Sequence, residues 1–145
     1  MQARRIAALA VLAVAAAGVY LPASAAAPKP ITKSYAMHLA PAADLCYDPA
    51  LNEKASHSET FTATGPGKFA AKIEGFQADW DLTLFNADGG VLAIGGGSQT
   101  GPDAKVNPTE QLIYKITKPG KYTITSCNFA GTLDAKGSFI FTPNK

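Results

Sequence analysis

Arginine is nearly absent from this 145-residue chain, in which Arg4 and Arg5 are the only two. The 13 basic residues therefore include eleven lysines, which equal the 11 Asp and Glu residues in number. Beyond position 5 the chain is formally neutral. Proteins that bind nucleic acid normally carry a basic patch in which Arg makes bidentate contacts to phosphate or guanine. This composition argues against nucleic acid as a partner.

Metal-ligating and catalytic residue types are also scarce. The chain has two histidines, His38 and His57, and two cysteines 81 positions apart, so it lacks the ligand spacing of a zinc site. His57 lies in the stretch SHSE, but a catalytic triad needs members that converge in space beside an oxyanion hole, and we do not expect neighbours on one strand to aim at one another. The stretch GGGSQTG is not a G-x-S-x-G motif. We therefore expect no enzyme and no metal site.

One long hydrophobic run is present, at residues 6–21. It follows a basic pair and precedes small residues, with Ala23 and Ala25 at the positions that a signal peptidase reads. A run of about sixteen residues is shorter than the roughly 20 that a spanning helix needs. We predict a signal peptide at residues 1–25, with a cut after Ala26 nearly as good. The product is expected to be secreted or periplasmic, with no membrane span in the mature chain.

The remaining residues, about 120 in number, suit one domain with a real core. Residues 26–32 contain two prolines and are expected to form a flexible leader, and residues 33–145 are expected to form a single domain. Because export implies an oxidising compartment, the two cysteines, Cys46 and Cys127, are predicted to form one disulfide.

Alternation of apolar and polar residues runs through most of this domain and predicts short β-strands. In residues 68–75, for example, Phe69, Ala71 and Ile73 alternate with polar residues, and the Asp-Gly-Gly stretch at 88–90 predicts a hairpin turn. Seven or eight strands are expected, in the segments 33–40, 57–64, 68–75, 79–86, 91–97, 109–117, 121–129 and 138–142. No convincing long helix is present. The pattern predicts an all-β fold, an antiparallel β-sandwich.

Two acids flank the only tryptophan of the chain, and Asp79, Trp80 and Asp81 are the candidate ligand-binding residues. Carboxylate oxygens suit calcium, which stays the open alternative, but the stretch lacks the pattern of a calcium-binding loop. We favour the interpretation that the acids lie on the solvated face of a strand or at its start, and that Asp88 shapes the following turn. Trp80 is a possible sugar-stacking platform, but it shares its face with Leu82 and Leu84, which favours the core.

Residues 57–142 resemble the bacterial pre-peptidase C-terminal domain. The resemblance rests on FTATGPGKFAAKIEGFQADWDLTLFNADGG, on EQLIYKITKPGKYTITSC and on GSFIF. It implies a small jelly-roll-like sandwich that is non-catalytic and aids secretion, targeting or substrate binding. Some relatives bind collagen and calcium, and their calcium ligands lie in an acidic segment that has no match in this chain. No peptidase domain precedes residue 57, so this is expected to be a stand-alone form.

Together these observations predict an exported, non-catalytic binding or accessory module that recognises a protein or glycan outside the cytoplasm. The alternative is a structural or envelope-associated protein that assembles with itself or a partner. A large exposed apolar patch or a long unpaired edge strand would favour assembly, and an exposed strip of aromatic side chains would favour glycan binding.

Overall fold

The computed structural model describes residues 28–42, 46, 53–95 and 109–145. The predicted signal peptide, residues 26–27 of the predicted leader and residues 96–97 of the predicted strand 91–97 lie outside these residues. Eight strands are present in the described part: β1 (Ile31–His38), β2 (Ser56–Ala63), β3 (Gly67–Glu74), β4 (Trp80–Phe85), β5 (Val91–Gly95), β6 (Glu110–Ile116), β7 (Gly120–Asn128) and β8 (Asp134–Pro143). This part of the chain contains no helix of the length and apolarity that crossing a membrane requires.

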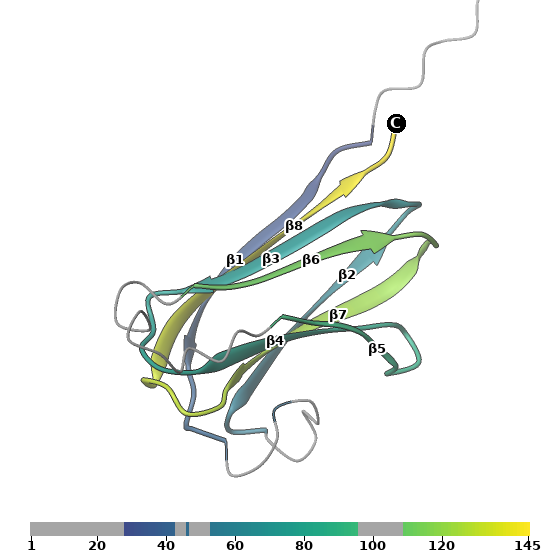
Figure 1. Ribbon diagram of the computed structural model, residues 1–145. Coiled ribbons are helices and arrows are strands. Elements are labelled where there is room, and N and C mark those ends of the chain that lie inside the picture. The colour runs from purple at the N-terminus through teal and green to yellow at the C-terminus, as the bar shows by residue number, and fades with distance from the viewer. Residues whose placement is uncertain (1–27, 43–45, 47–52, 96–108) are drawn as a thin grey trace, which may run out of the picture.

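The strands form two four-stranded antiparallel sheets that lie face to face (Figure 1). The first sheet has the order β1-β8-β3-β6, and the second has the order β2-β7-β4-β5. The β4–β5 hairpin stays within one sheet, and the other connections pass from one sheet to the other. This order is that of a jelly roll, which confirms the predicted antiparallel, jelly-roll-like β-sandwich.

The core lies between the sheets because each strand turns alternate side chains inward. The predicted alternation in β3 is confirmed, since Phe69, Ala71 and Ile73 are all buried. Phe61 of β2 packs against the other sheet. Its ring lies parallel to that of Phe69, with the ring centroids 5.0 Å apart, and its centroid is 5.3 Å from that of Phe139 in β8. Such aromatic contacts add to the free energy that area burial alone provides.

Two strands begin earlier than the sequence pattern predicts. β1 begins at Ile31, inside the predicted leader, and β8 begins at Asp134, inside a predicted loop. These two strands pair over their whole length, from Ile31 opposite Phe141 to His38 opposite Asp134. β8 also pairs with β3 on its other side. Backbone pairing with β1, and at Lys136 and Gly137 also with β3, therefore overrides the weak strand preference of the segment Asp134–Gly137.

The turn between β4 and β5 is confirmed as a hairpin, but its organising residue differs from the prediction. The Asn86 side-chain oxygen accepts hydrogen bonds from the backbone N–H groups of Asp88, at 3.0 Å, and Gly90, at 2.7 Å. The exposed Asp88 provides only its backbone to this arrangement. An asparagine side chain that bonds to the backbone two residues on is a common device for stabilising turns.

The predicted disulfide between Cys46 and Cys127 is confirmed, with Cα atoms 5.6 Å apart. Both cysteines are buried and lie together with Ala55 and Ala42. Because Cys127 belongs to β7, the bond fixes the connection between β1 and β2 to a central strand of the second sheet.

We expect replacement of both cysteines by alanine to lower the free energy of unfolding by about 4 kcal/mol, because the bond closes a long loop in the unfolded chain. Urea denaturation of the oxidised protein and of the Cys46→Ala/Cys127→Ala variant would measure the difference. A loss below about 1 kcal/mol would contradict a stabilising role for the disulfide.

Candidate functional site

Trp80 is a core residue and not a ligand platform. Its side chain has no exposed surface, and its ring lies 6.0 Å from that of Phe76. The indole N–H donates to the backbone carbonyl of Thr132 at 3.2 Å. The favoured interpretation of Trp80 as a core residue is therefore confirmed, and the alternative of sugar stacking is wrong because the buried ring is not exposed to a ligand.

Asp79 and Asp81 are less solvated than predicted. Asp79 precedes β4 and accepts a hydrogen bond at its backbone carbonyl from the N–H of Ala130, and Asp81 lies opposite Cys127 in the register of β4 and β7. Burial raises the pKa of Asp79. Burial, together with the negative charge of Asp79, raises the pKa of Asp81 to about 6. The two acids thus repel each other in a half-buried position beside the disulfide.

Metal-ligating residues do not gather in the part of the chain that the structure describes. No group of three or more His, Cys, Asp or Glu side chains is placed there to hold an ion. Asp79 and Asp81 are two such groups without a third, and calcium binding by them stays a proposal.

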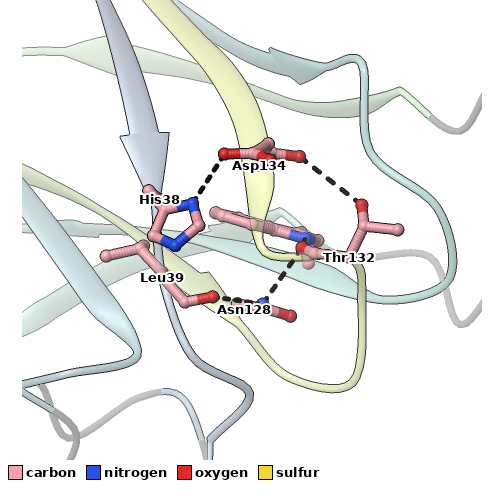
Figure 2. A network of polar contacts seen from close by, with 6 residues as sticks. His38, Leu39, Asn128, Thr132 and Asp134 are labelled. Atoms are coloured by element: carbon pink, nitrogen blue, oxygen red, sulfur yellow. Dashed lines mark hydrogen bonds and ion pairs between the residues drawn. The ribbon is translucent and has the colours of Figure 1, made fainter.

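A buried asparagine organises the end of the sandwich next to these acids (Figure 2). The Asn128 side-chain amide donates to the carbonyls of Leu39, at 2.8 Å, and Thr132, at 3.1 Å. Its side-chain oxygen accepts from the N–H of Gly131 at 2.7 Å. Every donor of this fully buried amide is therefore satisfied, and the end of β1 is tied to the loop between β7 and β8.

The backbone of Asn128 adds two further ties at the same end. Its N–H donates to the carbonyl of Ala55 at 2.9 Å, and its carbonyl accepts from the N–H of Ala42 at 2.7 Å. Both partners belong to the connection between β1 and β2, which the disulfide at Cys127 also holds. One residue of β7 thus fixes two separate connections.

His38 lies at the exposed rim of this network and points toward Asp134, as Figure 2 shows. Its Nδ1 is 2.7 Å from a carboxylate oxygen of Asp134, and both side chains are largely exposed. The two residues face each other in the register of β1 and β8. An exposed pair of this kind contributes little to the free energy of unfolding.

A second polar group lies between the edge strands β1 and β2. His57 Nε2 is 3.0 Å from Glu59, which also forms an ion pair with Lys33 across the sandwich. Burial raises the pKa of Glu59, but the bonds from Lys33 and His57 outweigh this effect and leave the pKa below its usual range. The expectation that neighbours of His57 on its own strand cannot aim at it is therefore wrong for Glu59, because residues two apart point to the same face.

Tyr35 completes this group. Its hydroxyl is 3.0 Å from Ser126 Oγ, and its ring lies 4.9 Å from that of His57. Gly137 lies against the Tyr35 ring at a position where a Cβ would collide with it. Ser126 faces His57 in the strand register but is fully buried. A serine without access to solvent and engaged by a tyrosine is poorly placed to attack a substrate.

The outer face of the first sheet carries a row of apolar side chains that sequence reasoning missed. Ile140 of β8 lies opposite both Thr32 and Ala70, and Ala70 lies opposite Ile113 of β6. Ile113 is 64% exposed and Ile140 is 40% exposed. The signal in the sequence was the outward position of Ile113 in its alternating strand. The row itself requires the strand order, which brings residues 70, 113 and 140 side by side.

Lysines lie on both sides of this apolar row. Lys68 and Lys115 lie directly opposite each other on one side, and Lys72 lies on the other side. Lys136 follows one row further along, opposite Glu74. We name this surface, from Lys68 and Lys115 to Lys136, the lysine–isoleucine face.

Comparisons with known proteins add little to this description. No protein-family model matches the chain, and no curated protein matches it. The resemblance of residues 57–142 to the pre-peptidase C-terminal domain therefore rests on its motifs alone.

Two viral structures are among the solved structures that are similar to this chain. One is the VP2 subviral particle of infectious bursal disease virus, with 9% identity and a TM-score of 0.41; the match covers 92% of this chain and 37% of that one. The other is the virus-like particle of the extra small virus of the prawn Macrobrachium rosenbergii, with 14% identity, a TM-score of 0.23 and coverage of 94% and 97%. Because both TM-scores are low, neither likeness carries an argument about this chain.

We expect Asn128→Ala to lower the free energy of unfolding by about 3 kcal/mol, because it leaves buried carbonyls and a buried N–H without partners. Urea denaturation would measure this loss, with Asn144→Ala, at an exposed position, as the control. A loss equal to that of the control would contradict the central role of Asn128.

We expect stability to fall as the pH rises through the window from 3.8 to about 6, in part because of Asp81. The folded state holds the Asp81 proton more tightly than the unfolded state does, so deprotonation favours unfolding. Asp81→Asn should remove this component and stabilise the protein by about 1 kcal/mol at pH 7.5, a modest value because solvent screens a half-exposed carboxyl.

Melting temperatures of the wild type and Asp81→Asn, recorded between pH 4 and pH 8, would test this expectation. Asp88→Asn, in the exposed turn, is the matched control. Parallel curves for all three proteins would show that Asp81 does not titrate differently in the folded and unfolded states. Repeating the melts with calcium and then with EDTA would show whether the two acids bind the ion.

Proposed function

We propose that this chain is an exported, non-catalytic binding module that recognises a protein through the lysine–isoleucine face. The observation that carries the proposal is the exposed apolar row formed by Ile113, Ala70 and Ile140. Exposed apolar side chains that lie next to one another are typical of interaction surfaces. The signal-peptide pattern of residues 1–25 supports a site of action outside the cytoplasm, secreted or periplasmic.

A protein partner fits this surface better than a glycan does. Glycan-binding sites commonly use aromatic rings as stacking platforms, whereas the described aromatic side chains are mostly buried; Phe129, at 39% exposure, is the large exposed one. Phe129 lies in the loop after β7 and not on the lysine–isoleucine face. The apolar residues on the face itself are aliphatic, which favours packing against another protein.

The proposal that the module is not an enzyme has support in the position of the polar groups. The carboxylate nearest His57 is engaged with Lys33, and the serine opposite His57 is buried under Tyr35. His38 and Asp134 lie exposed on the rim. Asp134 lines a hollow of about 750 Å³ that is partly open to solvent, whereas much of enzymatic catalysis depends on a site that desolvates the substrate.

Assembly is the second candidate function, and the edge strand β5 favours it. Val91 and Ile94 of this strand are 49% and 58% exposed. The outer edge of β5 presents unpaired backbone N–H and C=O groups with which another chain can pair, but its five residues make it shorter than the long edge strand that would favour assembly most. This surface belongs to the second sheet, so assembly through β5 would leave the lysine–isoleucine face free.

A photo-crosslinking amino acid at position 113 would test the binding proposal in the organism that makes the protein. We expect irradiation to give an adduct with one different protein, and the same amino acid at position 62, exposed on the second sheet, to give none. The adduct should weaken when Ile140→Ser is added, because this change removes part of the apolar row. The purified partner should then bind the wild-type chain in calorimetry.

The mass of the adduct distinguishes the candidate functions. An adduct of twice the mass of the chain would contradict recognition of a different protein and would show self-assembly through this face. Equal crosslinking from positions 113 and 62 would contradict a specific site. A crosslinker at position 94 tests assembly through β5 in the same way.

A further inference from the structure

Lys68 and Lys115 form a like-charged pair on the lysine–isoleucine face. They lie directly opposite each other on β3 and β6, and both are exposed. Like charges at opposed positions on one face of a sheet destabilise the pairing of the strands. Within the described residues neither lysine takes part in an ion pair. A local cost to stability without a compensating partner indicates that the counter-charge comes from another molecule.

A hollow lies on the opposite side of the apolar row from this pair. The apolar row and Lys72 line a hollow of about 270 Å³ whose floor contains the small residues Ala70 and Ser138. A second hollow, of about 390 Å³, also contains Ser138 and continues toward Lys136 and Glu74. The small side chains on β8 and β3 thus leave an open groove between longer ones.

The distance between the lysines along β3 limits which ligands can bind across the apolar row. Lys68 and Lys72 are four residues apart on β3, or about 13 Å at the rise of a strand. The apolar row lies midway between them, two residues from each. A complementary ligand therefore has an apolar group at its centre and one anionic group on each side. An extended peptide offers this arrangement when an apolar residue lies between two acids, each two positions away.

We propose that the lysine–isoleucine face binds an extended acidic segment of a partner protein, with the pattern acid-x-apolar-x-acid. This inference rests on the proposed function and gives the chemistry of its partner. The first acid would lie over the Lys68–Lys115 pair, and the second would compete with Glu74 for Lys72. The central apolar side chain would pack on Ala70 between Ile113 and Ile140.

A second copy of this chain is a poor occupant of the same face. A two-fold dimer would place the face against itself. The face carries four lysines, and its two acids are already engaged, Glu74 with Lys72 at 2.5 Å and Asp134 with His38 at 2.7 Å. Lysines would then meet lysines, which disfavours self-association and favours an acidic partner.

Synthetic peptides provide the test. The probe is a labelled peptide containing two copies of the sequence ESLSE, and its binding to the oxidised protein is measured by fluorescence anisotropy at low and high salt. Matched peptides replace the acids (QSLSQ) or the apolar residue (ESSSE). We expect ESLSE to bind at least about fivefold more tightly than either control, with an affinity that falls as salt rises.

Two double variants distinguish the effect of the lysines on the face from the effect of the protein's net charge. Lys68→Gln/Lys115→Gln should weaken binding of ESLSE at least about fivefold. Lys54→Gln/Lys121→Gln removes the same charge from exposed positions outside the face and should leave binding unchanged. Equal losses in both variants would overturn the proposal, because they would show an effect of net charge alone.

Lys115→Glu adds a readout that a purely structural role would not produce. This change converts the like-charged pair into an opposite-charged pair, so the melting temperature should rise while binding of ESLSE falls. A fall in both quantities would contradict the argument that the pair is kept for a ligand at the expense of stability.

Other anionic surfaces serve as competing probes. Tighter binding of heparin or of phosphatidylglycerol vesicles than of ESLSE, with the same dependence on Lys68 and Lys115, would overturn the acidic-peptide proposal in favour of a glycan or a lipid surface. If position 113 crosslinks to a protein but ESLSE does not bind, this inference fails and the binding module stands. If position 113 gives no crosslink but ESLSE binds at the face, the preference for acidic segments is supported. The proposal that the face recognises a protein in the organism is then contradicted.

Discussion

The hydrogen bonds of one buried residue, Asn128, hold the end of the sandwich where two connections meet. Asn128 bonds through its side chain to the end of β1 and to the loop before β8, and through its backbone to both ends of the connection between β1 and β2. A buried amide whose donors and acceptor all form hydrogen bonds can hold neighbouring loops in one arrangement. An apolar residue of similar size would leave several backbone groups unpaired. The adjacent disulfide at Cys127 closes the same connection covalently. This end of the molecule is therefore fixed twice, by different chemistry.

That fixed end has consequences for the rest of the structure. It sets the start of β8, and β8 lies between β1 and β3 in the first sheet. The register of β8 decides which of its side chains point outward, so it decides that Ile140 lies beside Ala70. A slip of one residue would place Ile140 in the core and expose Phe139 or Phe141. The lysine–isoleucine face thus depends on hydrogen bonds made at the far end of the same strand.

Local sequence patterns predict the interior of this protein well and its exterior poorly. Alternation of apolar residues in β3 and β4 identifies the inward face of each strand, and the two cysteines leave a single possible pairing. The beginning of β8 could not be predicted, because Asp134–Gly137 form a strand through pairing with β1, which lies far away in the sequence. The pKa of Asp81 depends on burial next to a neighbouring strand, which no local pattern contains. The apolar row also escapes prediction, since its members come from strands that are distant in sequence and adjacent in space.

The pairing of β1 with β8 has a consequence for the order in which the chain folds. The first strand along the sequence has the last strand as its partner in the sheet, and the β4–β5 hairpin is the local strand pair. Proteins dominated by such distant pairings fold slowly, because loops must close before their contacts can form. During synthesis, β1 therefore has no strand to pair with until β8 has been made. The first sheet can be completed only after β8 has been made, because β8 lies between β1 and β3, so in an unfinished chain both of these strands lack their shared partner.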